Sequence, residues 1–218
     1  MTIAIAPPRA AVVHYPESDG KPMAETDVHR KQMVALEFAL QNFFRDHPQI
    51  YVASNLLIYY VEGDYTQSVA PDVFVVKGVP KGNRRTFKLW EEGRAPTVVI
   101  ELTSDSTRKE DMGNKRLVYA DLGVQEYFIF DPLGQYLKPP LRGYRLSAGE
   151  YAPMSGEPLF SRELGLELHV DAGQLRLYDP QQQAYLLSPD ETQARAERAE
   201  AEIEKLRAEL ERLRGRLN

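Results

Sequence analysis

Four charged residues in the middle of the chain could together carry out chemistry. Asp72 and Glu101 each lie at the end of an apolar run, and Asp111 and Lys115 follow on a predicted helix. Carboxylates at the ends of two adjacent strands can converge on a divalent cation, and a nearby lysine can help to charge a water molecule or bind a phosphate. This combination of residues is typical of metal-dependent phosphodiester hydrolysis.

Each of these residues also has a plainer interpretation. Asp72 follows a proline, and aspartate at such a position often only caps a turn. Glu101 directly follows three apolar residues, where a carboxylate is costly unless it is paired or binds a metal, although a strand end can also face solvent. Asp111 and Lys115 lie four residues apart, which is the spacing of an ordinary ion pair on one helix face.

Taken together, the residues favour a magnesium site. A hard cation such as Mg²⁺ prefers oxygen ligands and keeps several water molecules, so two carboxylates suffice. Asp72 and Glu101 are therefore the predicted ligands of Mg²⁺ or Mn²⁺, and Lys115 is the predicted catalytic cation that stabilises the transition state. Ser104, Ser106 and Thr107 follow Glu101 closely and are interpreted mainly as helix caps.

The elements that would position these residues can be read along the chain. A helix is expected over residues 27–45 with Thr26 as its N-cap, and a second over residues 105–122 that Gly123 ends. Apolar and β-branched runs predict strands over residues 49–61, 69–76, 96–102 and 124–130, with a polar excursion at 77–93. A strand, a crossover helix and a returning strand predict a parallel pair within a mixed sheet.

The chain divides into three predicted parts. Residues 1–24 are proline-rich and are expected to form a flexible lead-in, and residues 25–188 form one α/β (α+β) domain. Hairpin-like segments at residues 141–154 and 166–187 are expected to be β extensions of the same domain. Residues 190–218 are predicted to form a C-terminal coiled-coil helix.

The C-terminal helix has an apolar residue at alternating intervals of three and four, which is the spacing of a coiled coil. The residues are Ala196, Ala199, Ile203, Leu206, Leu210, Leu213 and Leu217. In a parallel dimer, Glu202 would face Arg207 and Glu209 would face Arg214 of the partner. We therefore expect a homodimer; the alternative is an amphipathic helix that packs on its own domain.

Composition sets further bounds. The 218 residues contain no cysteine, which excludes disulfides and thiolate chemistry, and no apolar run reaches the length of a membrane helix. The N-terminus lacks the features of a signal peptide, so a cytoplasmic protein is expected. The net charge of −5 argues against strong duplex binding, although metal-binding carboxylates are themselves acidic.

These motifs resemble the Uma-two family of proposed restriction endonucleases, which belongs to the PD-(D/E)XK nuclease superfamily. The resemblance covers roughly residues 25–185, and the stretches that carry it include Ala70-Pro71-Asp72-Val73, Val99-Ile100-Glu101-Leu102-Thr103-Ser104-Asp105-Ser106-Thr107, Asp111 to Lys115, Tyr119-Ala120, Glu126-Tyr127 and Phe130-Asp131-Pro132. It implies a restriction-endonuclease-like mixed β-sheet flanked by helices, and Mg²⁺-dependent phosphodiester hydrolysis.

The resemblance also assigns roles to individual residues. Asp72 matches the acid of the PD motif and Glu101 matches the second acid. The superfamily lysine is expected two residues later, where this chain has Thr103, so the resemblance implies that Lys115 supplies it from the following helix. Glu37 and Glu126 are further candidates for auxiliary polar groups.

The sequence thus predicts a Mg²⁺-dependent DNA endonuclease. The alternative is a catalytically inactive nuclease-fold protein that acts as a nucleic-acid-binding module or a coiled-coil assembly scaffold. Two observations motivate it: Thr103 occupies the expected lysine position, and the net charge of the chain is negative. The four histidines are scattered without ligand-like spacing, and His29 is expected to be a surface or capping residue.

Overall fold

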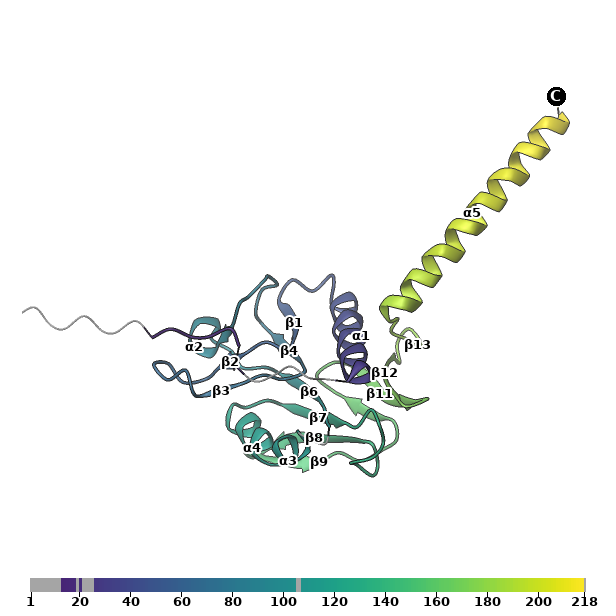
Figure 1. The fold of residues 1–218 in the computed structure, drawn as a ribbon. Coiled ribbons are helices and arrows are strands. Elements are labelled where there is room, and N and C mark those ends of the chain that lie inside the picture. Colours follow the sequence, from purple (N-terminus) through teal and green to yellow (C-terminus); the bar gives the residue numbers. More distant parts are fainter. Residues whose placement is uncertain (1–12, 19, 21–25, 105–106, 218) are drawn as a thin grey trace, which may run out of the picture.

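The computed structural model describes residues 13–18, 20, 26–104 and 107–217 (Figure 1). Its helices are α1 (Asp27–Phe43), α2 (Leu89–Glu92), α3 (Arg108–Met112), α4 (Asn114–Asp121) and α5 (Pro189–Leu217). Within these described ranges, none of the helices combines the length and apolar character that crossing a bilayer requires.

A six-stranded mixed sheet forms the centre of the molecule. Its strands, in spatial order, are β1 (Ile50–Ser54), β4 (Val73–Lys77), β6 (Val98–Leu102), β7 (Glu126–Phe130), β8 (Leu141–Ser147) and β9 (Glu150–Pro153). β6 and β7 are parallel and are connected through α3 and α4, whereas the other neighbouring strands are antiparallel. The predicted mixed sheet with a parallel crossover pair is therefore confirmed.

Two smaller sheets accompany the central one. One is antiparallel and contains β10 (Leu159–Ser161), β11 (Leu166–Asp171), β12 (Gln174–Asp179) and β13 (Ala184–Tyr185). The other contains β3 (Ser68–Val69), β2 (Ile58–Tyr59) and β5 (Phe87–Lys88). The hairpin expected at residues 141–154 is β8 and β9 of the central sheet, and the one expected at 166–187 lies in the separate four-stranded sheet.

The small sheet around β2 corrects two sequence predictions. The single strand expected over residues 49–61 is two strands in different sheets, because the chain turns at Asn55, whose φ is +46°. The strand expected over residues 69–76 is likewise divided, and the polar excursion contains β5 and α2. Within the expected lead-in, the Tyr15 ring packs against Tyr59 and Trp90, and the Pro16 carbonyl accepts a hydrogen bond from the Tyr59 hydroxyl.

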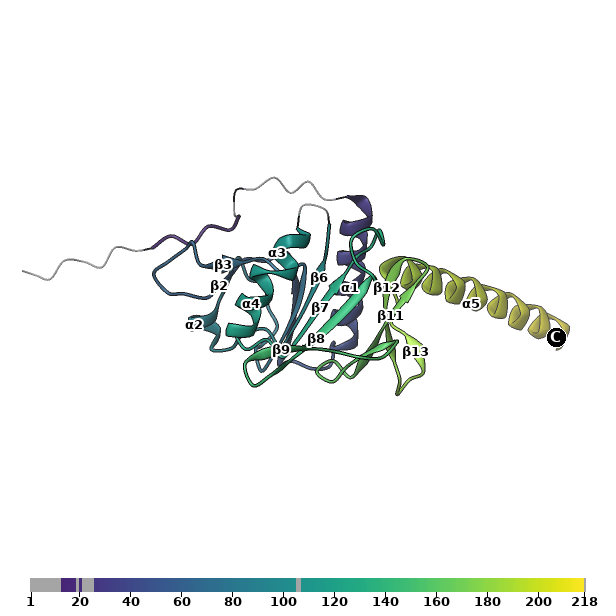
Figure 2. The ribbon, with the colours of Figure 1, turned by 90° about the horizontal axis from the view of Figure 1, so that it is seen from below.

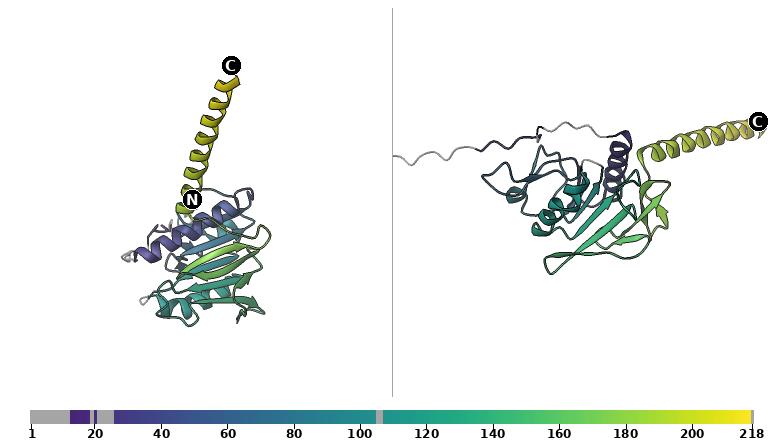
Figure 3. Two further views of the ribbon diagram at one scale, coloured as in Figure 1. Left: turned by 90° about the vertical axis from the view of Figure 1, so that its right-hand side faces the viewer. Right: turned by 60° about the horizontal axis from the view of Figure 1, so that its bottom comes forward.

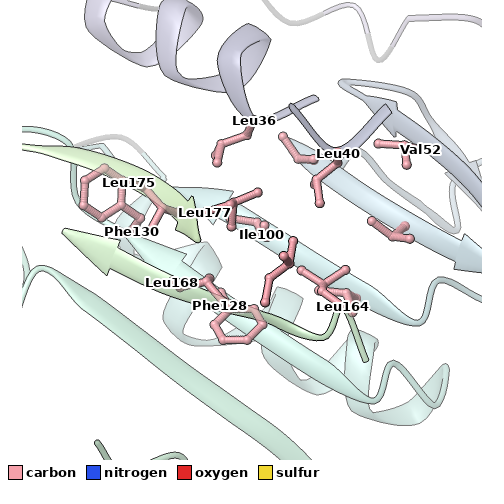
Figure 4. Packing of buried hydrophobic residues seen from close by; sticks show 14 of the residues in the cluster. Leu36, Leu40, Val52, Ile100, Phe128, Phe130, Leu164, Leu168, Leu175 and Leu177 are labelled. Atoms are coloured by element: carbon pink, nitrogen blue, oxygen red, sulfur yellow. The ribbon is translucent and has the colours of Figure 1, made fainter. Parts of the chain in front are cut away.

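Strands β6 and β7 are buried on both faces because helices or sheets cover each side. Side chains alternate along a strand, so Ile100 and Phe128 face one hydrophobic cluster and Val99 and Tyr127 face the other. The first cluster lies beneath α1 and β12 (Figure 4). Figure 2 shows α3 and α4 on the opposite side of the sheet from α1.

Helix α1 forms as predicted at its N-terminus. The Thr26 Oγ1 atom accepts a hydrogen bond from the His29 amide at 3.3 Å, which satisfies one of the free amides of the first turn. Met33, Leu36 and Leu40 form the buried stripe that holds the helix against the sheet. Each such side chain stabilises the fold by about 1.5–3 kcal/mol when it is fully buried. The helix ends at Phe43, two residues earlier than expected.

The helix expected over residues 105–122 is two short helices with a break at Gly113. Gly113 has φ −113° and ψ −100°, which is not helical. A Cβ atom at this position would lie 2.8 Å from the Lys109 carbonyl oxygen in α3. The junction between the two helices therefore requires glycine. Gly123, with φ +78°, ends α4 as predicted.

Helix α5 begins at Pro189 and projects away from the body in every view (Figures 1 and 3). At 1.5 Å per residue its 29 residues extend about 43 Å. The predicted C-terminal helix is therefore observed, whereas its pairing with a second chain stays a prediction.

The break at Gly113 generates a test of the fold. Gly113→Ala should lower the melting temperature by several degrees, because the new methyl group would displace the Lys109 carbonyl and push α3 and α4 apart. Asn114→Ala is the matched control, since this neighbouring side chain is exposed. Thermal unfolding followed by circular dichroism measures both variants. Equal melting temperatures would show that the junction tolerates a side chain.

Candidate active site

Strand pairing places Asp72 opposite Glu101. β4 and β6 are antiparallel with Val73 opposite Ile100, so the next pair along the ladder is Asp72 and Glu101. Residues directly opposite each other project to the same face of a sheet. The Asp72 amide donates to Glu101 Oε2 at 3.3 Å, and Asp72 Oδ2 accepts a hydrogen bond from the Leu102 amide at 2.7 Å.

Glu101 is a fully buried carboxylate. Because side chains alternate along β6, Glu101 lies on the same face as Val99, beneath α4. None of its side chain is exposed, and the Tyr119 hydroxyl donates to Oε1 at 2.7 Å. The Lys115 ammonium lies 3.1 Å from the same oxygen. α4 therefore supplies both groups that offset the burial of this charge.

Lys115 also contacts a second buried acid, Asp111. The Lys115 Nζ atom lies 3.0 Å from Asp111 Oδ1, and the Asp111 side chain is only 1% exposed. The i,i+4 ion pair considered for these residues is therefore present, but its two side chains are enclosed in the site and come from two short helices. Against burial, which raises the pKa of the Asp111 carboxyl, the Lys115 ammonium and the Thr107 side chain both act to lower it, which shows that this carboxyl has polar partners. Within the described residues, the buried Thr103 Oγ1 atom has no hydrogen-bond partner.

Helix α1 contributes His29 to the same place. The His29 Nε2 atom lies 2.7 Å from the Leu102 carbonyl oxygen and 3.4 Å from Asp72 Oδ2. The expectation of a surface or capping side chain was wrong, because His29 is buried. Its position in the stripe with Met33 and Leu36 was a signal in the sequence, since these residues repeat at the helical period.

The burial of these groups shifts their pKa values. Burial, together with Asp72 and Asp111, raises the pKa of Glu101 well above its ordinary range, even though Lys115 opposes this. Burial also raises the pKa of Asp111. For Asp72, burial acts to raise the pKa, but His29, Lys115 and the Leu102 amide together lower it.

The pKa of Lys115 shifts in the direction that keeps it charged. Burial alone would lower it, but Glu101, Asp111 and Asp72 raise it above its ordinary value. Three carboxyl groups thus face one ammonium, and ionising all three beside a neutral His29 would leave two negative charges uncompensated. Uncompensated charge in a buried site is costly.

This surplus of negative charge fits a divalent cation. Asp72 and Glu101 bring carboxyl groups together from the ends of adjacent strands, and Asp111 adds a third acid through Lys115. No group of three or more acidic or histidine side chains in the described part of the chain forms a ready-made metal cage. The residues therefore suit an ion such as Mg²⁺, which binds through one or two carboxylates and otherwise keeps water or phosphate oxygens.

Two other predicted acids lie apart from this cluster. Glu37 accepts hydrogen bonds from Gln41 at 3.0 Å and from Ser54 at 2.5 Å, and it contacts none of the site residues. Glu126 is buried and bound by Arg145 at 2.8 Å and by the Ser161 hydroxyl. It links the central sheet to β10, so its role is structural.

The polar residues after β6 make local hydrogen bonds. The Ser104 amide donates to Thr107 Oγ1 at 3.1 Å, and the Thr107 amide donates to Ser104 Oγ at 3.4 Å. These contacts agree with their interpretation as caps at the start of α3. Ser106, the third predicted cap, lies outside the described residues.

Comparison with known proteins shows the family to which the chain is similar. A family model described as "Uma2: Putative restriction endonuclease" matches residues 11–210. A search of curated proteins finds no match. A crystal structure of a "putative nuclease belonging to DUF820" from Anabaena variabilis ATCC 29413 has 18% sequence identity and a TM-score of 0.47, over 65% of this chain and 74% of that chain.

The raised pKa values predict how stability depends on pH without metal. The folded state holds protons on Glu101 and Asp111 that the unfolded chain, with carboxyl pKa values near 4, releases. This contribution is fully present below about pH 4 and is lost as pH rises through the raised values. The melting temperature in EDTA should therefore fall between about pH 5 and pH 8.

Glu101→Gln should flatten this pH dependence because the amide cannot ionise. The exposed neighbour Glu110, changed to Gln, is the control and should leave the slope of the wild-type protein intact. Melting temperatures of all three proteins across the pH series measure the effect. A slope that is unchanged in Glu101→Gln would contradict the assigned burial of this carboxylate.

Proposed function

Because this chain belongs to the Uma2 family, described as "Putative restriction endonuclease", we propose that it is a Mg²⁺-dependent endonuclease that hydrolyses DNA phosphodiester bonds. One observation carries the proposal. The Asp72 amide and the Lys115 ammonium both contact the Glu101 carboxylate, at 3.3 and 3.1 Å, although Thr103 occupies the expected lysine position. Two acids and a lysine are the groups that metal-assisted phosphodiester hydrolysis needs.

Asp72 and Glu101 are the proposed ligands of Mg²⁺ or Mn²⁺. When bound, the ion would lower the pKa of a coordinated water molecule and offset the negative charge of the phosphate. The hydrogen bond from the Leu102 amide fixes one oxygen of Asp72, and Tyr119 fixes one oxygen of Glu101. The carboxylates are thereby oriented before substrate arrives, which reduces the reorganisation needed during reaction.

Lys115 is proposed to stabilise charge and not to remove a proton. Its pKa is raised, so the ammonium stays protonated at neutral pH and cannot act as a general base. A protonated lysine beside Glu101 can hydrogen-bond the attacking water molecule or a phosphate oxygen as negative charge develops there. Asp111 is a positioning residue in this scheme, because it holds the ammonium from the other side.

The substrate, the cellular compartment and the oligomeric state are further parts of the proposal. The substrate is DNA, the compartment is the cytoplasm, and the active form is a homodimer assembled through the C-terminal helix. The net charge of −5 implies that affinity for DNA depends on the bound cation and on local basic groups more than on the overall charge. Binding should consequently weaken as salt is raised.

The second candidate function is a catalytically inactive nuclease-fold protein that binds nucleic acid or serves as an assembly scaffold. Thr103 in place of the usual lysine and the acidic balance favour it. The two candidates differ in one respect: the inactive protein needs no functional cation at Asp72 and Glu101.

Cleavage of supercoiled plasmid and of single-stranded DNA in Mg²⁺ or Mn²⁺ tests the proposal. Asp72→Asn, Glu101→Gln and Lys115→Met should each lower the rate by about 100-fold or more, because each removes a ligand or the charge at the reacting phosphate. Lys88→Met is the control, since Lys88 forms an ion pair with Glu91 away from the site. Variants that cleave at the wild-type rate would refute the assigned site.

Metal binding can be measured without activity. Mg²⁺ or Mn²⁺ should raise the melting temperature of the wild-type protein, because a ligand that binds only the folded state stabilises it. The shift should be lost in Glu101→Ala and retained in Lys115→Met. Metal binding with no cleavage of any nucleic acid would favour the inactive scaffold.

A further inference from the structure

A row of large apolar side chains on α5 is exposed to solvent. Ile203 is 48% exposed, Leu206 50%, Leu210 55% and Leu213 49%. Monomeric proteins rarely leave a continuous apolar row uncovered, so this row marks a contact surface. Figure 3 shows the helix extending away from the sheets and from α1.

The body of the same chain does not cover this row. Only the start of α5 is attached: Arg176 on β12 pairs with Glu191 at 2.9 Å, and Glu191 Oε2 accepts a hydrogen bond from the Ser188 amide at 2.8 Å. From residue 197 to residue 214 every side chain is exposed. The alternative in which α5 packs along its own domain is therefore wrong for this structure.

The spacing of the row specifies the kind of partner. Ala196 and Ala199 continue the row toward the start of α5. The a positions of consecutive heptads are then Ala196, Ile203 and Leu210, and the d positions are Ala199, Leu206 and Leu213. This pattern is typical of a two-stranded coiled coil, in which each helix supplies a matching row. We propose that α5 pairs with α5 of a second copy of this chain, in parallel and in register.

Charges beside the row support the parallel orientation. In a parallel pair each g residue faces the e residue five positions later on the partner. The three such pairs are Arg195 with Glu200, Glu202 with Arg207, and Glu209 with Arg214. Each pair joins opposite charges, and each occurs twice in a symmetric dimer.

The charges at the same e and g positions disfavour an antiparallel pair. The alignment that overlaps the same a and d positions places g residues against g residues, so Glu202 faces Glu209 of the other chain. It also places Arg207 opposite its own copy, and only Glu200 with Arg214 is an attractive pair. Like charges in these positions disfavour a pairing, whereas the apolar row itself does not distinguish the two orientations.

The proposed pairing has a consequence for the whole assembly. Because each α5 is attached to its body at its N-terminal end, a parallel pair holds both bodies at the same end of the coil. The inference rests on α5 alone and stands independently of the proposed hydrolysis.

Oligomeric state tests the surface directly. The full chain at about 100 μM should have the mass of a dimer by light scattering after gel filtration. Leu206→Asp with Leu210→Asp should convert it to a monomer with an unchanged near-ultraviolet circular dichroism spectrum, because the body does not contact the row. A monomeric wild-type chain, or a dimer that survives both substitutions, would overturn the proposal.

Orientation can be tested by crosslinking, since the chain contains no cysteine. Leu213→Cys, at a d position, should form a disulfide between chains on mild oxidation, because equal d positions face each other in a parallel pair. Glu211→Cys, at an outer b position, is the control and should not. If Leu213→Cys dimerises without crosslinking, but crosslinks when mixed with Ala196→Cys, which faces it in the antiparallel alignment, the helices are antiparallel and the proposal is wrong.

Discussion

The buried contact between Lys115 and Glu101 is the interaction on which the site depends. A carboxylate with no exposed surface would be expelled from the sheet core unless a positive charge and a hydroxyl accompanied it. Lys115 supplies that charge, and its own burial is in turn offset by Asp111 and Glu101. The three residues thus require one another, and α4 must lie against β6 for any of them to be buried.

Several features of the fold serve this contact. The antiparallel register of β4 and β6 sets Asp72 beside Glu101, and the break at Gly113 turns the chain so that Asp111 and Lys115 face the sheet from two helices. His29 joins α1, on the opposite face, to the end of β6. Several acids lie together at the ends of β4 and β6, and burying them lowers the stability of the folded protein. Functional sites commonly lower stability in this way.

The sequence predicted the parts of this arrangement that local patterns determine. Thr26 and the apolar stripe predict α1, and the apolar runs predict β4, β6 and β7. Asp72 and Glu101 come together because β4 and β6 are neighbouring strands. What the sequence missed depends on distant contacts. The break at Gly113 follows from a close approach to Lys109, and the burial of His29 follows from α1 crossing the end of β6. The spacing of His29 with Met33 and Leu36 indicates its burial but not its contact with β6, and no residue spacing indicates the break at Gly113.

Diffraction from crystals soaked in Mn²⁺ tests the central claim most directly, because anomalous scattering locates the ion without reference to activity. The account predicts a single strong peak within about 2.2 Å of a carboxylate oxygen from both Asp72 and Glu101, with the Lys115 ammonium beside it. A peak elsewhere, or none at saturating Mn²⁺ with the Lys115–Glu101 contact unchanged, would contradict it.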